Sequence, residues 1–194
     1  MEERNLTPQE SLQVIQNMME QTQRNVLCHS GAPSLIWGYT TTFISLLIYF
    51  LYPHMGNDAN YFWFGIPVVG SLFIWMLKRK KKKQHVPTTR MDKFLNVVWF
   101  VIGLNVLCLS LFPTRHILSL VLILIGAATA ITAFAVNVKV FKYSSVFGMM
   151  VGYLLLILSI SVEQKVLIFA IAFFLMHCIP GHIISAQLKK ERDA

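Results

Sequence analysis

Six apolar runs, each close to the length that crosses a lipid bilayer, occupy most of this chain. A hydrocarbon core about 30 Å thick needs roughly 17 to 25 mainly apolar residues in a helix. A buried helix of a soluble protein can imitate one such run, but not six in succession. The chain is therefore predicted to be an all-α integral membrane protein with six transmembrane helices. The expected spans are Leu35–Tyr52, Tyr61–Leu77, Phe94–Phe112, Ile117–Val138, Ser145–Ile160 and Val166–Ile184.

The composition agrees with this class. Of the 194 residues, 55% are hydrophobic and 13% are charged, whereas soluble domains carry about 25% charged residues. The net charge of +8 could indicate a nucleic-acid partner, but the chain has no basic stripe interleaved with aromatic residues. The sequence therefore predicts the lipid bilayer as a partner and excludes nucleic acid.

The basic residues follow the connections between the runs. If six helices alternate in direction, all but two of the 17 Lys and Arg residues fall on one side; Arg115 and Lys165 fall on the other. Short cytoplasmic loops are enriched in Lys and Arg. Both termini are therefore predicted to be cytoplasmic, with the protein in the cytoplasmic (inner) membrane. The block Lys78-Arg79-Lys80-Lys81-Lys82-Lys83 holds its loop in the cytoplasm, or contacts anionic lipid head groups.

Short outer connections make consecutive helices antiparallel neighbours, so the spans are expected to form three antiparallel hairpins. The expected domains are a cytoplasmic helix and linker (1–33), a six-span helical bundle (34–187) and a cytoplasmic tail (188–194). In the fifth run, Gly148 and Gly152 form a GxxxG pattern. Small residues at this spacing let helices approach closely, which predicts tight packing here.

The cytoplasmic segment before the first span is predicted to be an amphipathic helix. Thr7 is a capping residue, Pro8 suits the first helical position, and Glu10 completes a capping box. Apolar residues then recur at helical spacing, at Leu12, Ile15, Met19 and Val26 with Thr22 between the last two. Gly31 and Pro33 indicate where the helix ends.

Three roles are open for this helix. It carries one Arg and two Glu, whereas helices that bind anionic lipid carry many basic residues. An interfacial helix that folds back under the bundle is the favoured interpretation. A cytoplasmic protein partner, or a homo-oligomer formed through residues 8–27, remains open.

Ionisable residues inside a membrane are the default candidates for function because each is costly there. The six runs contain no Asp, Glu, Lys or Arg, which argues against an ion-coupled transporter. The remaining candidates are His177, Cys178 and His182, beside a helix kink expected at Pro180 and Gly181. A metal site needs three or four ligands, so the favoured interpretation is structural: His177 bonds to a neighbouring helix and His182 lies at the interface.

Two asparagines, Asn105 and Asn137, are the other candidates for an intramembrane polar site. Asn side chains in membranes commonly join helices through hydrogen bonds of about 1 kcal/mol. This role is favoured over substrate binding.

No catalytic motif occurs in the chain: it has no GxSxG, no HExxH and no glycine-rich nucleotide loop. The three cysteines, Cys28, Cys108 and Cys178, form no CxxC pair. The sequence therefore predicts no enzyme activity, no cofactor and no metal.

Both ends of the chain resemble a family of small, uncharacterised multi-pass proteins of the bacterial cytoplasmic membrane. The resemblance rests on the polar helix Ser11–Met19, on Ser34-Leu35-Ile36-Trp37-Gly38-Tyr39 at the first span, and on Ile179-Pro180-Gly181-His182-Ile183-Ile184 in the last. The six-span layout is also similar, in architecture alone, to the bacterial acid-resistance six-span membrane family. The first resemblance implies a bacterial inner-membrane location but no activity.

Two functions therefore remain open. The first is a non-enzymatic membrane scaffold or regulator that makes contacts through its N-terminal helix. The second is a small permease or channel with a polar path near Asn105, Asn137 and His177.

Overall fold

All regular structure in the described part of the chain is helical. The computed structural model describes residues 7–81, 90–112, 114, 116–135 and 137–193. Five helical stretches are long and apolar enough to cross a membrane: Gly31–Leu77, Lys93–Ser110, Ile117–Ala135, Lys139–Ile157 and Val162–Gln187. The predicted all-α class with several long apolar helices is confirmed. The first stretch contains two of the six predicted runs, so a count of six crossings remains a prediction.

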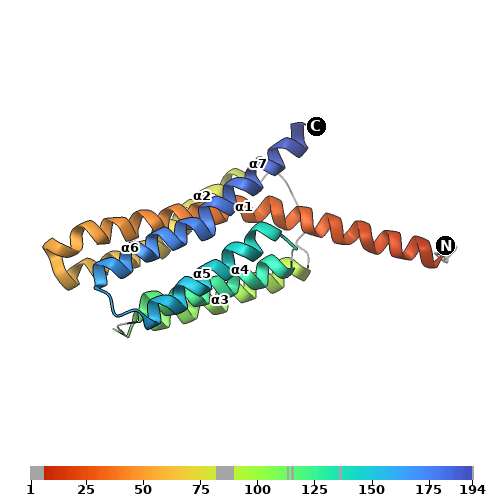
Figure 1. Ribbon diagram of the computed structural model, residues 1–194. Helices are drawn as coiled ribbons and strands as arrows, with labels where there is room; N and C mark the ends of the chain where they lie inside the picture. Colours follow the sequence, from red (N-terminus) through yellow and green to blue (C-terminus); the bar gives the residue numbers. More distant parts are fainter. Residues whose placement is uncertain (1–6, 82–89, 113, 115, 136, 194) are drawn as a thin grey trace.

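The first helix, α1, runs without a break from Pro8 to Met55. Its start has the predicted capping box: the Thr7 side chain accepts from the Glu10 N–H, and the Glu10 carboxylate accepts from the Thr7 N–H. Its predicted end is wrong, because the helix passes through Gly31 and Pro33. Its N-terminal part projects well beyond the other helices (Figure 1). The favoured expectation of a separate helix folded back under the bundle is therefore not what this fold contains.

The chain reverses direction in a short 3₁₀ segment, η1 (Gly56–Phe64). Pro53 lies inside α1, shortly before the turn. The turn begins at Gly56, whose φ of 57° together with a ψ of −132° is readily adopted only by glycine. Helix α2 (Gly65–Lys81) then returns along α1 (Figure 1).

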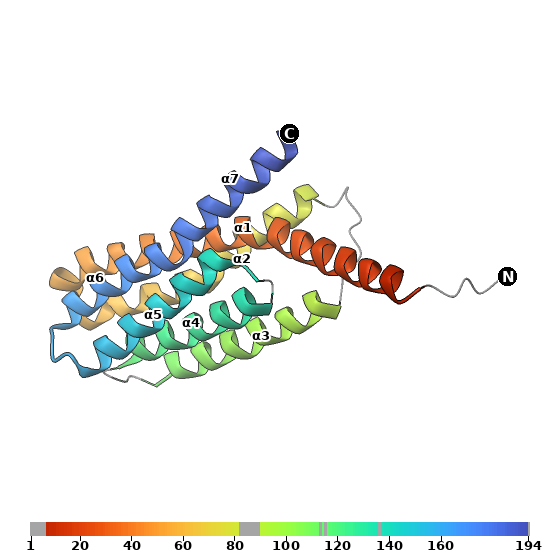
Figure 2. The same cartoon turned by 45° about the vertical axis from the view of Figure 1, so that its right-hand side comes forward.

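The other helices are α3 (Arg90–Ser110), α4 (Ile117–Ala135), α5 (Lys139–Ile157), α6 (Val162–Phe173) and α7 (Ile179–Asp193), with the π-helical turn η2 (Phe174–Cys178) between the last two. Helices α1, α2 and α6–α7 form one layer, and α3, α4 and α5 form a second (Figures 1 and 2). The most extensive contact joins α4 to α5, while α5 touches α6 only sparingly. The third expected hairpin, α5 with α6, is thus a minor contact of the bundle.

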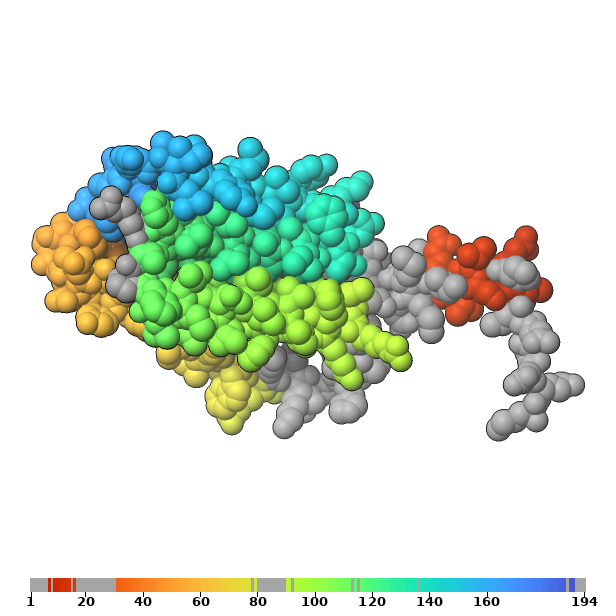
Figure 3. Space-filling view, turned by 90° about the horizontal axis from the view of Figure 1, so that it is seen from below, coloured from red at the N-terminus to blue at the C-terminus, as the bar shows by residue number. Residues whose placement is uncertain are grey.

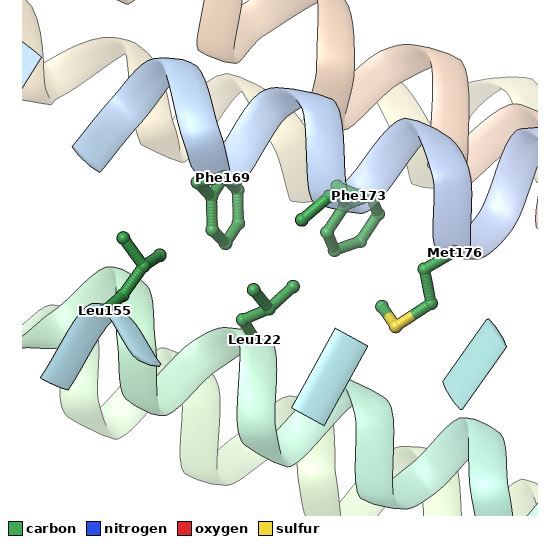
Figure 4. Packing of buried hydrophobic residues seen from close by; sticks show 6 residues of the cluster. Leu122, Leu155, Phe169, Phe173 and Met176 are labelled. Atoms are coloured by element: carbon green, nitrogen blue, oxygen red, sulfur yellow. The ribbon is translucent and has the colours of Figure 1, made fainter. Parts of the chain in front are cut away.

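The core lies between the two layers. Phe169, Phe173 and Met176, on α6 and η2, face Leu122 of α4 and Leu155 of α5 (Figure 4). A second cluster joins Ile44 and Ile48 of α1 to Ala59 and Val166. These contacts pack α6 against α1, and they pack α6 and η2 against α4 and α5.

Much of the remaining surface is apolar. Helix α3 lies on the outside beside α4 (Figure 3), and its Phe100 is 70% exposed. On α2, Val68 is 68% exposed. Large apolar side chains are exposed along much of α2 and α3, which suits contact with lipid.

Candidate functional site

A five-residue π-turn interrupts the last long helix where α1 crosses it. Pro180 has no N–H to donate to the carbonyl four residues earlier, and its ring crowds that carbonyl. The turn immediately before it, Phe174–Cys178, is widened into a π-turn, and helix continues from Ile179. Pro180 and Gly181 therefore mark a local widening, and the helix does not end there.

His177 lies in this turn and is 4% exposed. Its ring stacks on Phe173, with centroids 4.6 Å apart, and continues a row of aromatic side chains formed by Trp63, Phe169 and Phe173. The histidine thus occupies the end of a packed aromatic row, which holds its ring in one orientation.

Ser34 of α1 is the polar partner of His177. Its hydroxyl oxygen lies 3.2 Å from the His177 carbonyl, to which it donates, and 3.4 Å from Nδ1. Because the hydroxyl proton goes to the carbonyl, the oxygen can accept from Nδ1–H. In the tautomer that carries the ring proton on Nδ1, this contact is a hydrogen bond and Nε2 is a buried acceptor. Nε2 has no partner among the described residues.

Close packing of α1 on η2 depends on Gly38. A Cβ at this position would lie 2.7 Å from the Cys178 Sγ and 3.0 Å from the His177 Cβ. Cys178 is buried against this glycine. The thiol of Cys178 is therefore part of the packing between α1 and η2. Among the described residues, no group of three His, Cys, Asp or Glu side chains could hold a metal.

His182 belongs to a different environment. Its Nε2 lies 2.6 Å from the Tyr39 hydroxyl, and both side chains are exposed. The Tyr39 ring also meets Phe174 edge to face. His177 and His182 thus both contact α1, but they do not share a site.

The two candidate asparagines lie elsewhere. Asn105 is exposed on α3 and donates to the Val101 carbonyl of its own helix. Asn137 lies in the turn between α4 and α5, with a φ of 56°, and accepts from the Lys142 ammonium group. Since His177 lies between α1 and the core, the three side chains form no common polar path.

The basic block continues α2. Lys78, Arg79, Lys80 and Lys81 form its last turn, and the Arg79 guanidinium lies 3.6 Å from the centroid of the Trp75 ring. Lys82 and Lys83 lie outside the described residues. Arg79 and Trp75 together place a cation beside an amphipathic ring, as is common at a membrane interface.

Glycines bring α4, α5 and η2 together. A Cβ on Gly148 would overlap the Met176 sulfur, and one on Gly152 would lie 2.7 Å from Ile123. Gly126 of α4 similarly faces Met149 at 2.6 Å. The two glycines of the GxxxG pattern thus face two different neighbours, η2 and α4.

Sequence reasoning did not single out Ser34, Gly38 or Tyr39 as site residues. Each of these residues contacts η2 or α7, which begin about 140 residues later in the chain. No local sequence pattern could therefore identify these contacts. Ser161 was also missed, although its signal was available. It caps α6 in a Ser-x-x-Gln box with Gln164.

Comparison of the chain with protein-family models, curated proteins and solved structures found no match. Fold and geometry therefore define its class: an all-helical protein whose long apolar helices suit a bilayer.

Proposed function

We propose that this protein crosses the cytoplasmic membrane six times, with both termini in the cytoplasm, and acts without catalysis as a scaffold or regulator. Its contacts with other proteins are made by residues 8–30 of α1. The proposed topology places η1 and the α3–α4 and α5–α6 connections outside. It is supported by the reversal of the chain at η1 (Figure 1) and by the distribution of Lys and Arg.

One observation carries the functional proposal: the segment before the first span is continuous with the helix that packs on His177. A separate interfacial helix would need a break to turn into the membrane plane. An unbroken helix instead projects from the bundle. Its 23 residues would extend about 34 Å at 1.5 Å per residue.

The permease alternative has less support. Asn105 and Asn137 lie on the outer helix and in a turn, and the only residue of that set in the interior is His177. We therefore retain contact through the N-terminal helix as the proposed function.

Photo-cross-linking tests the proposal. A benzophenone amino acid is placed at position 15 or position 17 of the full-length protein, and native membranes are irradiated. We expect adducts with protein. Adducts with lipid alone would contradict the proposal. A variant lacking residues 2–30 should keep its spans inserted, and the protein captured by the full-length chain should no longer co-purify with it.

A further inference from the structure

We propose that the projecting part of α1, residues 8–30, pairs in parallel with the same segment of a second copy of this chain. The inference rests on the proposed function, because it names the partner of the projecting helix.

The helical spacing of this segment defines a two-heptad seam. Because α1 is continuous from Pro8, Leu12, Met19 and Val26 take the a positions of a heptad. The d positions are Pro8, Ile15, Thr22 and His29. Leu12, whose side chain is described, is 66% exposed. The bundle itself therefore does not cover the start of this seam.

The charges of the segment all lie away from the seam. Glu10 and Arg24 occupy f positions and Glu20 occupies a b position, which are the outer positions of a coiled coil. The flanking e and g positions carry no charge; they are Gln9, Ser11, Gln16, Met18, Gln23, Asn25 and Ser30. Charged e and g residues set partner choice in coiled coils, and like charges there oppose self-pairing. Two identical copies therefore meet in register without repulsion.

The same charges favour a second copy over a membrane surface. Interfacial helices gain from Lys and Arg on their polar face, whereas this segment carries two Glu and one Arg. A partner of different sequence would be selected by charges at e and g, and this helix offers none.

Attachment to the bundle compensates for the short seam. Two heptads are marginal as an isolated pair in solution. Copies in one membrane share an orientation, which makes the pairing parallel, and confinement raises their effective concentration. The continuous helix also reduces the ordering cost of association.

Disulfide cross-linking in native membranes tests the pairing. In a full-length Cys28→Ser/Cys108→Ser background, Ile15→Cys and Thr22→Cys place a thiol at d positions. Asn17→Cys and Arg24→Cys place it at f positions as matched controls. With copper phenanthroline we expect disulfide dimers from both d variants and loss of that product in both f variants. Adding Leu12→Glu and Met19→Glu should abolish the Thr22→Cys dimer.

The outcomes separate this inference from the proposed function. Equal cross-linking at d and f positions, or none at d, overturns the parallel pair. If the benzophenone at position 15 then captures a protein other than this chain, the proposed function stands and the second copy is excluded. If that probe captures lipid alone, both proposals fail.

Discussion

At the scale of single residues, His177 combines burial with a ring nitrogen, Nε2, that has no hydrogen-bond partner among the described residues. A buried polar atom without a partner costs about 1–3 kcal/mol, whereas an apolar group of the same shape can be neutral or stabilising. The histidine is held by its stacking on Phe173 and by Ser34. Since Ser34 bonds to the His177 carbonyl, that hydrogen bond survives a change of side chain.

We therefore expect His177→Phe to keep thermal stability in detergent within about 1 kcal/mol of the parent protein, or to raise it. Phe173→Ala is the comparison, with an expected loss of about 3–5 kcal/mol because it removes a buried ring. A loss in His177→Phe as large as that in Phe173→Ala would contradict this expectation.

Gly38 sets the distance between α1 and η2. Gly38→Ala places a methyl group against Cys178 and His177, and overpacking of this kind costs about 1–3 kcal/mol. Gly103→Ala is the matched control, since nothing lies within 4 Å of a Cβ at that position on α3. Thermal unfolding in detergent should show a lower midpoint for Gly38→Ala alone; equal midpoints would rule out a tight crossing at Gly38.

At the scale of elements, the sequence predicted helix starts better than helix ends. Thr7 and Glu10 form a local capping box, so the start of α1 could be read from four residues. Gly31 and Gly181 resembled stop or hinge signals, but they are contact residues. A Cβ on Gly181 would lie 2.8 Å from Leu35, and one on Gly31 would lie 3.3 Å from Ser185. Packing of α7 on α1 stabilises helix through Pro33, and a single sequence does not reveal which distant helix packs there.

The cap at the start of α1 is sensitive to pH. Hydrogen bonds from the Thr7 N–H and hydroxyl lower the pKa of Glu10 below its ordinary value. The folded-state pKa is depressed, so the stabilisation is present above the unfolded-state pKa and is lost as pH falls through the folded-state pKa. We expect the protection factors of amides in the first turn, which are corrected for the pH dependence of intrinsic exchange, to fall on acidification in the parent protein and to stay constant in Glu10→Gln. Thr7→Ala should destabilise the first turn at all pH values, by about 1 kcal/mol.

At the scale of the whole molecule, the apolar runs predicted the class because hydrophobicity and length are local properties. The packing of the helices against one another was harder to predict from the sequence. The expected hairpins follow from loop length, yet the most extensive contact joins α4 to α5 across the turn that contains Asn137. Gly126 and Gly152 permit that contact. To predict that these two glycines lie in one helix contact, one must know how α4 and α5 are aligned along each other. The exposure of Asn105 could not be predicted for the same reason, because it depends on which face of α3 packs against α4.

Thiol accessibility in sealed cells or vesicles tests the six-crossing topology. In a Cys28→Ser/Cys108→Ser background, Asp58→Cys, Thr114→Cys and Glu163→Cys should react with an impermeant maleimide added outside. Lys142→Cys and Gln187→Cys should react only after the membrane is permeabilised. Labelling of Gln187→Cys from outside would contradict the proposed cytoplasmic placement of the C-terminus.

The contact between Ser34 and His177 also constrains the order of assembly. The two residues are 143 positions apart, and ribosomes add roughly 5–20 residues per second. The first helix therefore waits about 7–29 s before its partner emerges. During that interval α4 and α5, which are neighbours in the chain, can already pair. The crossing at η2 therefore forms only after α4 and α5 can pair, and a chain truncated before residue 177 should leave its first helix open to quality-control proteases.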